Sequence, residues 1–188
     1  VKEDGSKLAQ DDFASLAKRT PQTHGEHYKY LGNYLDLFEL MRNYLTTYKI
    51  EAPKLLRILV FNYLYSNGDA HFKNFSILET PFGDYSLSPA YDLLCTTLHL
   101  PTESRTALNI FDDFITPSFD ANAFAKRSDF MELANRFGLR EPRVVAILDR
   151  FAIERPTMEA LLDRSLLSPE GNARYRAILA DRIVALAD

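Results

Sequence analysis

The stretch YLYSNGDAHFKNFSIL, residues 63–78, places a short polar loop between two apolar runs. The loop carries hydrogen-bonding or charged side chains, and these are Asn67, Asp69, His71, Lys73 and Asn74. Asp69 and Asn74 stand five positions apart, at opposite ends of the loop, so their side chains can approach one point from two directions. Polar side chains that interrupt two core segments require an explanation, and this loop is the first candidate for a functional site.

The composition is that of one folded domain or one lobe of a larger protein. The 188 residues are 46% hydrophobic and 26% charged, which is enough to bury a core. The net charge of −4 gives no sign of a nucleic-acid surface, so we predict no direct binding to nucleic acid. The single Cys95 excludes an intrachain disulfide framework and fits a reducing compartment, the cytoplasm. No stretch approaches the ~18 apolar residues that cross a membrane.

Apolar periodicity predicts helices over most of the chain. Residues 28–48 repeat apolar side chains at helical spacing, and residues 53–66 are apolar almost all round. Pro53 suits the first turn of the second helix, and a helix that is apolar on every side must be buried. Such a helix is a rigid platform that leads directly into the polar loop. Three further helical patterns follow, at residues 124–137, 144–151 and 173–187.

The residues after the loop predict a β-hairpin. FSIL at 75–78 and YSLS at 85–88 are strand formers, and the connection ETPFGD contains Pro81 and Gly83. A hairpin returns the chain to the polar loop, where the following segment PAYDLLC can place Asp92. The sequence therefore predicts a mainly α fold with one small β-hairpin beside the polar loop.

Three oxygen-bearing side chains follow one another at a spacing that suits phosphoryl transfer. This chemistry needs a carboxylate that orients the acceptor hydroxyl, and oxygen ligands for a Mg²⁺ ion that bridges the nucleotide phosphates. Protein kinases use an Asp in the catalytic loop, an Asn five residues later and a second Asp beyond a short hairpin. Asp69, Asn74 and Asp92 occur in that order and context.

The motifs also resemble those of a known family. NGDAHFKNFSIL followed by LSPAYDLL is similar to the paired signature of the HipA-like serine/threonine kinases, the toxins of bacterial toxin–antitoxin modules. Weaker similarity runs through LAQDDFASL upstream and SDFMELANRFGL downstream, so the resemblance covers most of the chain. It implies that residues 1–188 form the helical C-terminal lobe, the catalytic lobe, of a kinase-like fold.

The resemblance implies a serine/threonine protein kinase that uses Mg²⁺ and ATP. By the match of motifs, Asp69 is the catalytic residue, and Asn74 and Asp92 are the Mg²⁺ ligands. His71 is expected to orient a neighbouring carbonyl or carboxylate, and Lys73 either faces the transferring phosphate or lies in solvent. The family further implies autophosphorylation, a protein substrate such as an aminoacyl-tRNA synthetase, and neutralisation by an antitoxin with a DNA-binding domain.

The sequence departs from the family in its nucleotide clamp. Among seven glycines there is no loop of the form G-x-G-x-x-G or G-x-x-x-x-G-K-[ST]. Too few residues precede Tyr28 to build the N-terminal lobe that covers ATP, and the chain opens at Val1 without an initiator methionine. We therefore expect a fragment or a processed chain from which the ATP-clamping N-terminal lobe is absent.

Other interpretations of the same residues stay open on the sequence. Asp69 can cap backbone N–H groups of the loop, Asn74 can end the loop in the same way, and Asp92 can cap a helix that begins near Leu93. The chain can be a truncated, non-catalytic binding module, or half of a split kinase that works only with a separate N-lobe. A metal-dependent phosphohydrolase built on Asp69, His71 and Asp92 is a weaker alternative, because such sites use more His and Asp ligands.

Overall fold

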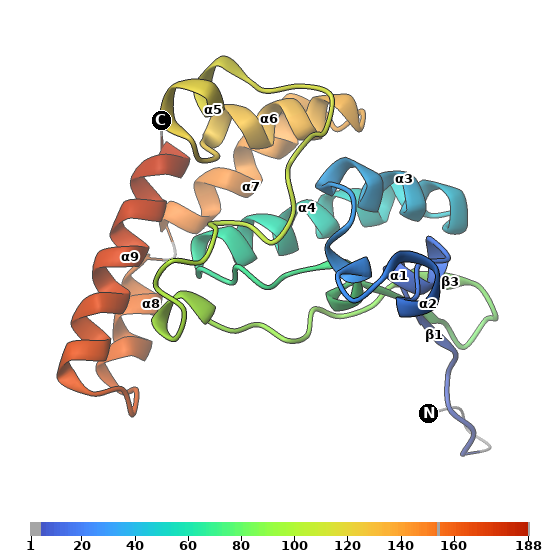
Figure 1. The fold of residues 1–188 in the computed structure, drawn as a ribbon, viewed down its shortest axis with the longest axis horizontal. Helices are drawn as coiled ribbons and strands as arrows, with labels where there is room; N and C mark the ends of the chain where they lie inside the picture. The colour runs from blue at the N-terminus through green and yellow to red at the C-terminus, as the bar shows by residue number, and fades with distance from the viewer. Residues whose placement is uncertain (1–4, 154, 188) are drawn as a thin grey trace.

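The computed structural model describes residues 5–153 and 155–187, and within them helices predominate (Figure 1). The α-helices are α1 Phe13–Leu16, α2 Pro21–His24, α3 Tyr34–Tyr44, α4 Tyr48–Leu64, α5 Pro117–Asn122, α6 Arg127–Arg136, α7 Glu141–Ile153, α8 Arg155–Asp163 and α9 Pro169–Ala187. Single 3₁₀ turns are η1 Tyr28–Tyr30, η2 Phe72–Asn74 and η3 Thr96–Leu98, and the strands are β1 Gln10–Asp12, β2 Ser76–Glu79 and β3 Tyr85–Leu87. The predicted fold class, mainly α with a small hairpin, is confirmed.

Helix α4 is the centre of the fold. It contacts α3, α7, α9 and β3, and Figure 1 shows it passing between the sheet end of the molecule and the C-terminal helices. Five of its large apolar side chains are completely buried: Leu55, Leu56, Leu59, Val60 and Leu64. The predicted burial of this helix is therefore confirmed, and the platform beneath the polar loop is well packed.

The start of α4 differs from the prediction. The helix begins at Tyr48, so that Pro53 lies inside it instead of in the first turn. The N–H groups of Ile50 and Glu51 donate to the carbonyl of Thr47, at 2.8 and 3.2 Å, and build the additional turn. These early bonds are made by the backbone and leave no trace in the apolar pattern, which is why the sequence places the helix start too late.

The hairpin is confirmed, and a third strand extends it. β2 pairs antiparallel with β3, and β1 pairs with the other edge of β2, with Gln10 opposite Leu78 and Asp12 opposite Ser76. The three residues of β1 read QDD and carry no strand-forming side chain, so β1 is held by backbone pairing together with the bond that Gln10 Nε2 donates to Ser76 Oγ at 3.1 Å. The Phe13 N–H continues the contact by donating to the Phe75 carbonyl at 2.9 Å.

The helix predicted over residues 28–48 is broken. Tyr28–Tyr30 form a single 3₁₀ turn, the chain bends at Gly32 with φ of +92°, and α3 begins only at Tyr34. Asn33 starts α3, since its side chain accepts from the Asp36 N–H at 2.9 Å. The break places Tyr30 outside α3, with consequences for the polar loop.

The C-terminal helices follow the sequence pattern in part, since α8 lies outside the helical patterns predicted there. The three helical patterns predicted there correspond to α6, α7 and α9. In Figure 1, α9 runs along one side of the molecule with its C-terminal end towards α5, while the three-stranded sheet lies at the opposite side. Across residues 5–153 and 155–187, no helix combines the length and apolar character that a membrane crossing requires.

Candidate active site

The polar loop begins with a sharp change of direction at the end of α4. Ser66 has φ of +59°, in the left-handed region, and the Asn67 N–H donates back to the Asn62 carbonyl at 2.8 Å. Ser66 and Asn67 are both buried, so the turn is part of the core. The loop therefore leaves a fixed helix end in a fixed direction, as the buried platform predicts.

The side chain of Asn67 joins the two acidic positions of the site. Its Nδ2 donates to the Asp92 carbonyl and to Asn62 Oδ1, each at 2.9 Å, while its Oδ1 accepts from the Asp69 N–H at 3.3 Å. One buried amide thus connects α4, the start of the loop and the segment after the hairpin. Asn67 was predicted only as a polar residue of the loop, because the contact to the Asp92 carbonyl exists only in the tertiary fold.

Asn74 and Asp92 are in direct contact. Asn74 Nδ2 lies 2.5 Å from Asp92 Oδ2, and Asn74 Oδ1 accepts from the His71 N–H at 3.0 Å. Asp92 is exposed and has φ of +55°. No helix begins near Leu93, and the next regular turn is η3, so the alternative in which Asp92 caps a helix is wrong. The hairpin does return Asp92 to the end of the loop, as predicted.

Asp69 lies at the start of the loop and is half-buried. Its carboxylate accepts a hydrogen bond from the Tyr30 hydroxyl, with 2.5 Å between the two oxygens, and its carbonyl accepts from the His71 N–H at 2.8 Å. Burial, followed by the bond to Asp69, raises the pKa of Tyr30 to about 12. Tyr30 was not predicted as a site residue, because the apolar pattern placed it within a helix.

His71 lies within the electrostatic influence of the Asp69 and Asp92 carboxylates. It is 6% exposed, and burial, followed by the nearby charge of Lys29, lowers the pKa of its imidazole, whereas Asp69 and Asp92 both act to raise it. Its Nδ1 has no hydrogen-bond partner in the described part of the chain. The backbone N–H of His71 holds the amide of Asn74.

Lys73 is exposed at the outer side of η2. Its carbonyl accepts from the Tyr91 hydroxyl at 2.7 Å, and the same hydroxyl lies 2.5 Å from Ser76 Oγ. This pair of contacts fastens the segment before Asp92 to the end of the loop. The ammonium group of Lys73 remains on the surface, where a phosphate group or solvent can reach it.

The donor set at Asn74 and Asp92 fits Mg²⁺ held together with a nucleotide. Mg²⁺ is usually bound by one or two carboxylates plus phosphate and water oxygens, and seldom by an all-protein cage. Asp92 supplies an exposed carboxylate, and an amide oxygen such as Asn74 Oδ1 has a second lone pair besides the one used by His71. Residues 5–153 and 155–187 contain no group of three His, Cys, Asp or Glu side chains that could hold a metal ion.

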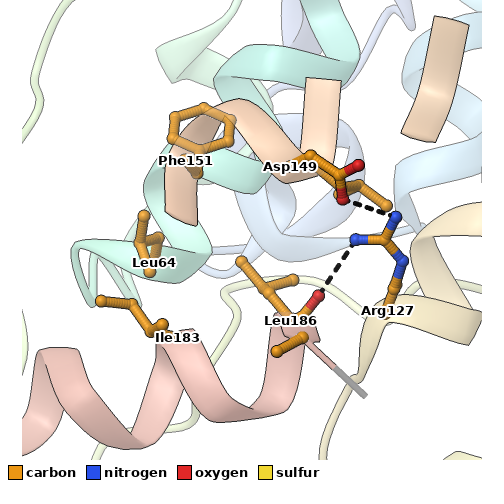
Figure 2. A pocket seen from close by; sticks show the side chains of 8 residues that line it. Leu64, Arg127, Asp149, Phe151, Ile183 and Leu186 are labelled. Carbon is orange, nitrogen blue, oxygen red and sulfur yellow. Dashed lines mark hydrogen bonds and ion pairs between the residues drawn. The ribbon is translucent and has the colours of Figure 1, made fainter. Parts of the chain in front are cut away.

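A cavity of about 460 Å³ lies away from these residues (Figure 2). Leu64, Phe151, Ile183 and Leu186 provide most of its apolar wall. At its polar side the Arg127 guanidinium pairs with Asp149 at 2.8 Å and donates to the Leu186 carbonyl at 3.4 Å. The cavity takes no side chain from the polar loop, so it is separate from the candidate active site.

The architecture belongs to the kinase-like class. It matches HipA of Shewanella oneidensis MR-1, solved as a toxin–antitoxin complex with HipB and operator DNA, with a TM-score of 0.69 and 21% identity over 100% of this chain and 46% of that one. It also matches the proinflammatory kinase CtkA of Helicobacter pylori, with a TM-score of 0.59 and 15% identity over 98% of this chain and 70% of that one. At such identities the matches show the fold.

A family model then assigns the chain more closely. The model of the HipA-like C-terminal domain matches residues 2–157, and the chain therefore belongs to this family, as its motifs predicted. Two proteins of Sinorhizobium fredii provisionally named as kinases are similar: Y4mE is 32% identical over 129 residues, and Y4dM is 34% identical over 99 residues. The matched regions are 65% and 53% of this chain but 29% and 23% of those relatives, so the chain spans less than a third of their length.

Proposed function

We propose that this chain is the catalytic lobe of a serine/threonine protein kinase that transfers the γ-phosphoryl group of ATP to a protein hydroxyl. Membership of the HipA-like family and the kinase names of its relatives support the proposal. The observation that carries it is the 2.5 Å contact between Asn74 and Asp92, joined through Asn67 to the backbone of Asp69. The backbone of Asp69 and the Asn74–Asp92 pair are thus linked through one buried amide, which supports a site that combines a carboxylate for the acceptor hydroxyl with oxygen ligands for Mg²⁺.

In this proposal Asp69 acts on the acceptor hydroxyl. Its carboxylate accepts the hydroxyl proton while the acceptor oxygen forms a bond to the γ-phosphorus. The bond between that phosphorus and the β,γ-bridging oxygen breaks, and ADP leaves with the electron pair. The loop positions Asp69 for this role because its N–H is bound by Asn67 and its carbonyl by His71.

Asn74 and Asp92 would hold Mg²⁺ in the complete enzyme. When bound, the ion neutralises charge on the nucleotide phosphates. The His71 N–H fixes the amide of Asn74, and the Tyr91 hydroxyl fixes the backbone at Lys73, so the end of the loop is restrained by two contacts. Lys73, exposed beside Asn74, supplies a positive charge at the phosphate side of the site.

The biological setting is proposed from the family. The Shewanella HipA forms a complex with HipB and operator DNA. We extend the same arrangement to this chain: a toxin kinase of the cytoplasm that a DNA-binding antitoxin neutralises and that phosphorylates a translation-related protein, such as an aminoacyl-tRNA synthetase. The net charge of −4 supports contact with DNA through the antitoxin rather than through this chain.

A second candidate function follows from how much of a related protein this chain covers. Because the chain spans 46% of the Shewanella HipA, the lobe can be inactive alone and work only with a separate chain that provides the ATP-clamping lobe. Mixing the purified chain with a chain corresponding to the N-terminal lobe distinguishes the two. Phosphoryl transfer that appears only in the mixture favours the split arrangement.

The proposed function is tested with the complete protein, [γ-³²P]ATP and Asp69→Asn. Loss of the carboxylate that accepts the proton is expected to lower phosphoryl transfer by about 10³-fold. The matched control is Asp112→Asn, at an exposed aspartate outside the polar loop, which leaves the rate unchanged. A loss of less than about tenfold in Asp69→Asn, with the protein folded, refutes the assignment.

A further inference from the structure

The Tyr30 hydroxyl occupies one oxygen of the Asp69 carboxylate. The hydroxyl oxygen lies 2.5 Å from Oδ1, which makes this the side-chain contact that fixes the rotation of the carboxylate. The two residues are 39 positions apart in the sequence, so the contact depends on how the fold brings η1 beside η2. The sequence motif around Asp69 does not predict this contact.

The ring of Tyr30 is itself held in place. It packs edge-on against the buried His71 ring, with 5.2 Å between the centroids and an interplanar angle of 77°. The Lys29 ammonium lies 5.0 Å from the centroid of the Tyr30 ring. His71 belongs to the same loop as Asp69, so the ring contact and the hydroxyl contact act on one structural unit.

The backbone after Tyr30 is fastened to η2 as well. Arg19 donates to the Leu31 carbonyl, and its guanidinium lies 4.4 Å over the ring of Phe72 in η2. Gly32 has φ of +92°, and a Cβ there would meet the carboxylate of Asp36 and the guanidinium of Arg19. The positive φ favours glycine at this position, and the turn at Gly32 sets the backbone that follows Tyr30.

The chemistry of the contact leaves room for a substrate. With a pKa of about 12, the Tyr30 phenol stays protonated at neutral pH and acts as a donor. An ionised carboxylate has two oxygens and about four acceptor positions, so a bond to Oδ1 does not prevent a second donor from binding Oδ2. The tyrosine and an acceptor hydroxyl can therefore bind the same carboxylate from different sides.

We propose that Tyr30 is a positioning residue for phosphoryl transfer: its hydroxyl holds Asp69 Oδ1 so that Oδ2 faces the acceptor hydroxyl. The inference rests on the proposed function, in which Asp69 receives the proton of the acceptor. Tyr30 touches neither the nucleotide nor Asn74 and Asp92 in this role, so its loss changes the chemical step and leaves ATP binding in place.

The test compares Tyr30→Phe with Tyr28→Phe in the complete protein. Tyr28 lies in the same turn and packs on the core, and its hydroxyl makes no hydrogen bond within the described residues, which makes it a matched control. Tyr30→Phe is expected to lower kcat for phosphoryl transfer by about 10- to 100-fold with the KM for ATP within about twofold. Tyr28→Phe is expected to keep both constants, and both variants to keep their Tm within a few degrees.

A double-mutant cycle separates positioning from a general structural effect. If Tyr30 acts through Asp69, adding Tyr30→Phe to Asp69→Asn lowers the residual rate no further. The inference is overturned if Tyr30→Phe lowers the rate by the same factor in the wild-type and the Asp69→Asn backgrounds. It is also overturned if kcat is unchanged in Tyr30→Phe, or if kcat is raised, which would mean that Tyr30 blocks the site. A large fall in Tm with kcat and KM changing together also overturns it. A wild-type rate in Asp69→Asn refutes the proposed function instead.

Discussion

Asn67 connects three parts of the chain through one side-chain amide, and its loss has two expected effects. Asn67→Ala leaves the Asp92 carbonyl and Asn62 Oδ1 without that donor, which is expected to cost about 1–3 kcal/mol of unfolding free energy. The substitution also removes the link between Asp92 and Asp69, so the rate of phosphoryl transfer is expected to fall by more than the loss of stability explains. Urea unfolding and a kinase assay measure the two effects, with the exposed Asn43→Ala as control. Unchanged activity in Asn67→Ala would show that the amide does not hold the site together.

His71 provides a pH-dependent contribution to stability. Burial lowers the pKa of its imidazole below the ordinary value of 6.5, so the unfolded chain binds the proton more readily than the folded one. The contribution is complete above about pH 6.5 and is lost as the pH falls towards the folded-state pKa. In EDTA, the unfolding free energy of His71→Gln is therefore expected to decrease less than that of the wild-type protein between about pH 7 and 5. The exposed His99→Gln is expected to keep the wild-type slope, and equal slopes in all three proteins contradict this account.

The residues of the site were predictable to different degrees. Asp69, Asn74 and Asp92 could be selected because a loop and a hairpin between them are visible in local sequence. Tyr30 and Asn67 could not, since each acts through a contact that only the tertiary fold creates. Tyr30 was missed because of the left-handed turn at Gly32. The apolar pattern continues across this turn, whereas the helix is interrupted there.

At the scale of elements, α4 determines where the polar loop lies. Leu59 is completely buried in this helix, and Leu59→Ala is expected to cost about 2–5 kcal/mol of unfolding free energy through lost burial and a residual cavity. Ile50 in the same helix is 60% exposed, so Ile50→Ala is expected to cost less than about 0.5 kcal/mol. Chemical denaturation measures both, and similar losses at the two positions would mean that α4 is not the buried platform.

The elements were predicted where side chains carry the signal. The core of α4 and the β2–β3 hairpin follow from apolar and strand-forming side chains. β1 and the first turn of α4 are held by backbone hydrogen bonds, which the sequence pattern does not record. The helix α8 was also missed, although it buries the side chains of Met158 and Leu162.

At the scale of the whole molecule, the exposure of the site predicts how the chain binds nucleotide. Asp92 is exposed and Asp69 half-buried, whereas nucleotide sites usually bury most of the ligand. If a further lobe of the protein provides the other wall of the nucleotide site, the isolated chain is expected to bind Mg²⁺-ATP at least about 100-fold more weakly than the complete protein. Isothermal titration calorimetry on both proteins measures the difference. Submicromolar affinity of the isolated chain for Mg²⁺-ATP would contradict the expectation that the ATP-clamping lobe is absent from this chain.

The central claim is that Asn74 and Asp92 hold a divalent cation beneath the nucleotide, and Mn²⁺ binding tests it most directly. Electron paramagnetic resonance counts Mn²⁺ bound to the complete protein in the presence of a non-hydrolysable ATP analogue. Asp92→Asn and Asn74→Ala are each expected to weaken that binding by at least about tenfold, while Asp112→Asn leaves it unchanged. Wild-type Mn²⁺ affinity in both folded site variants would contradict the account.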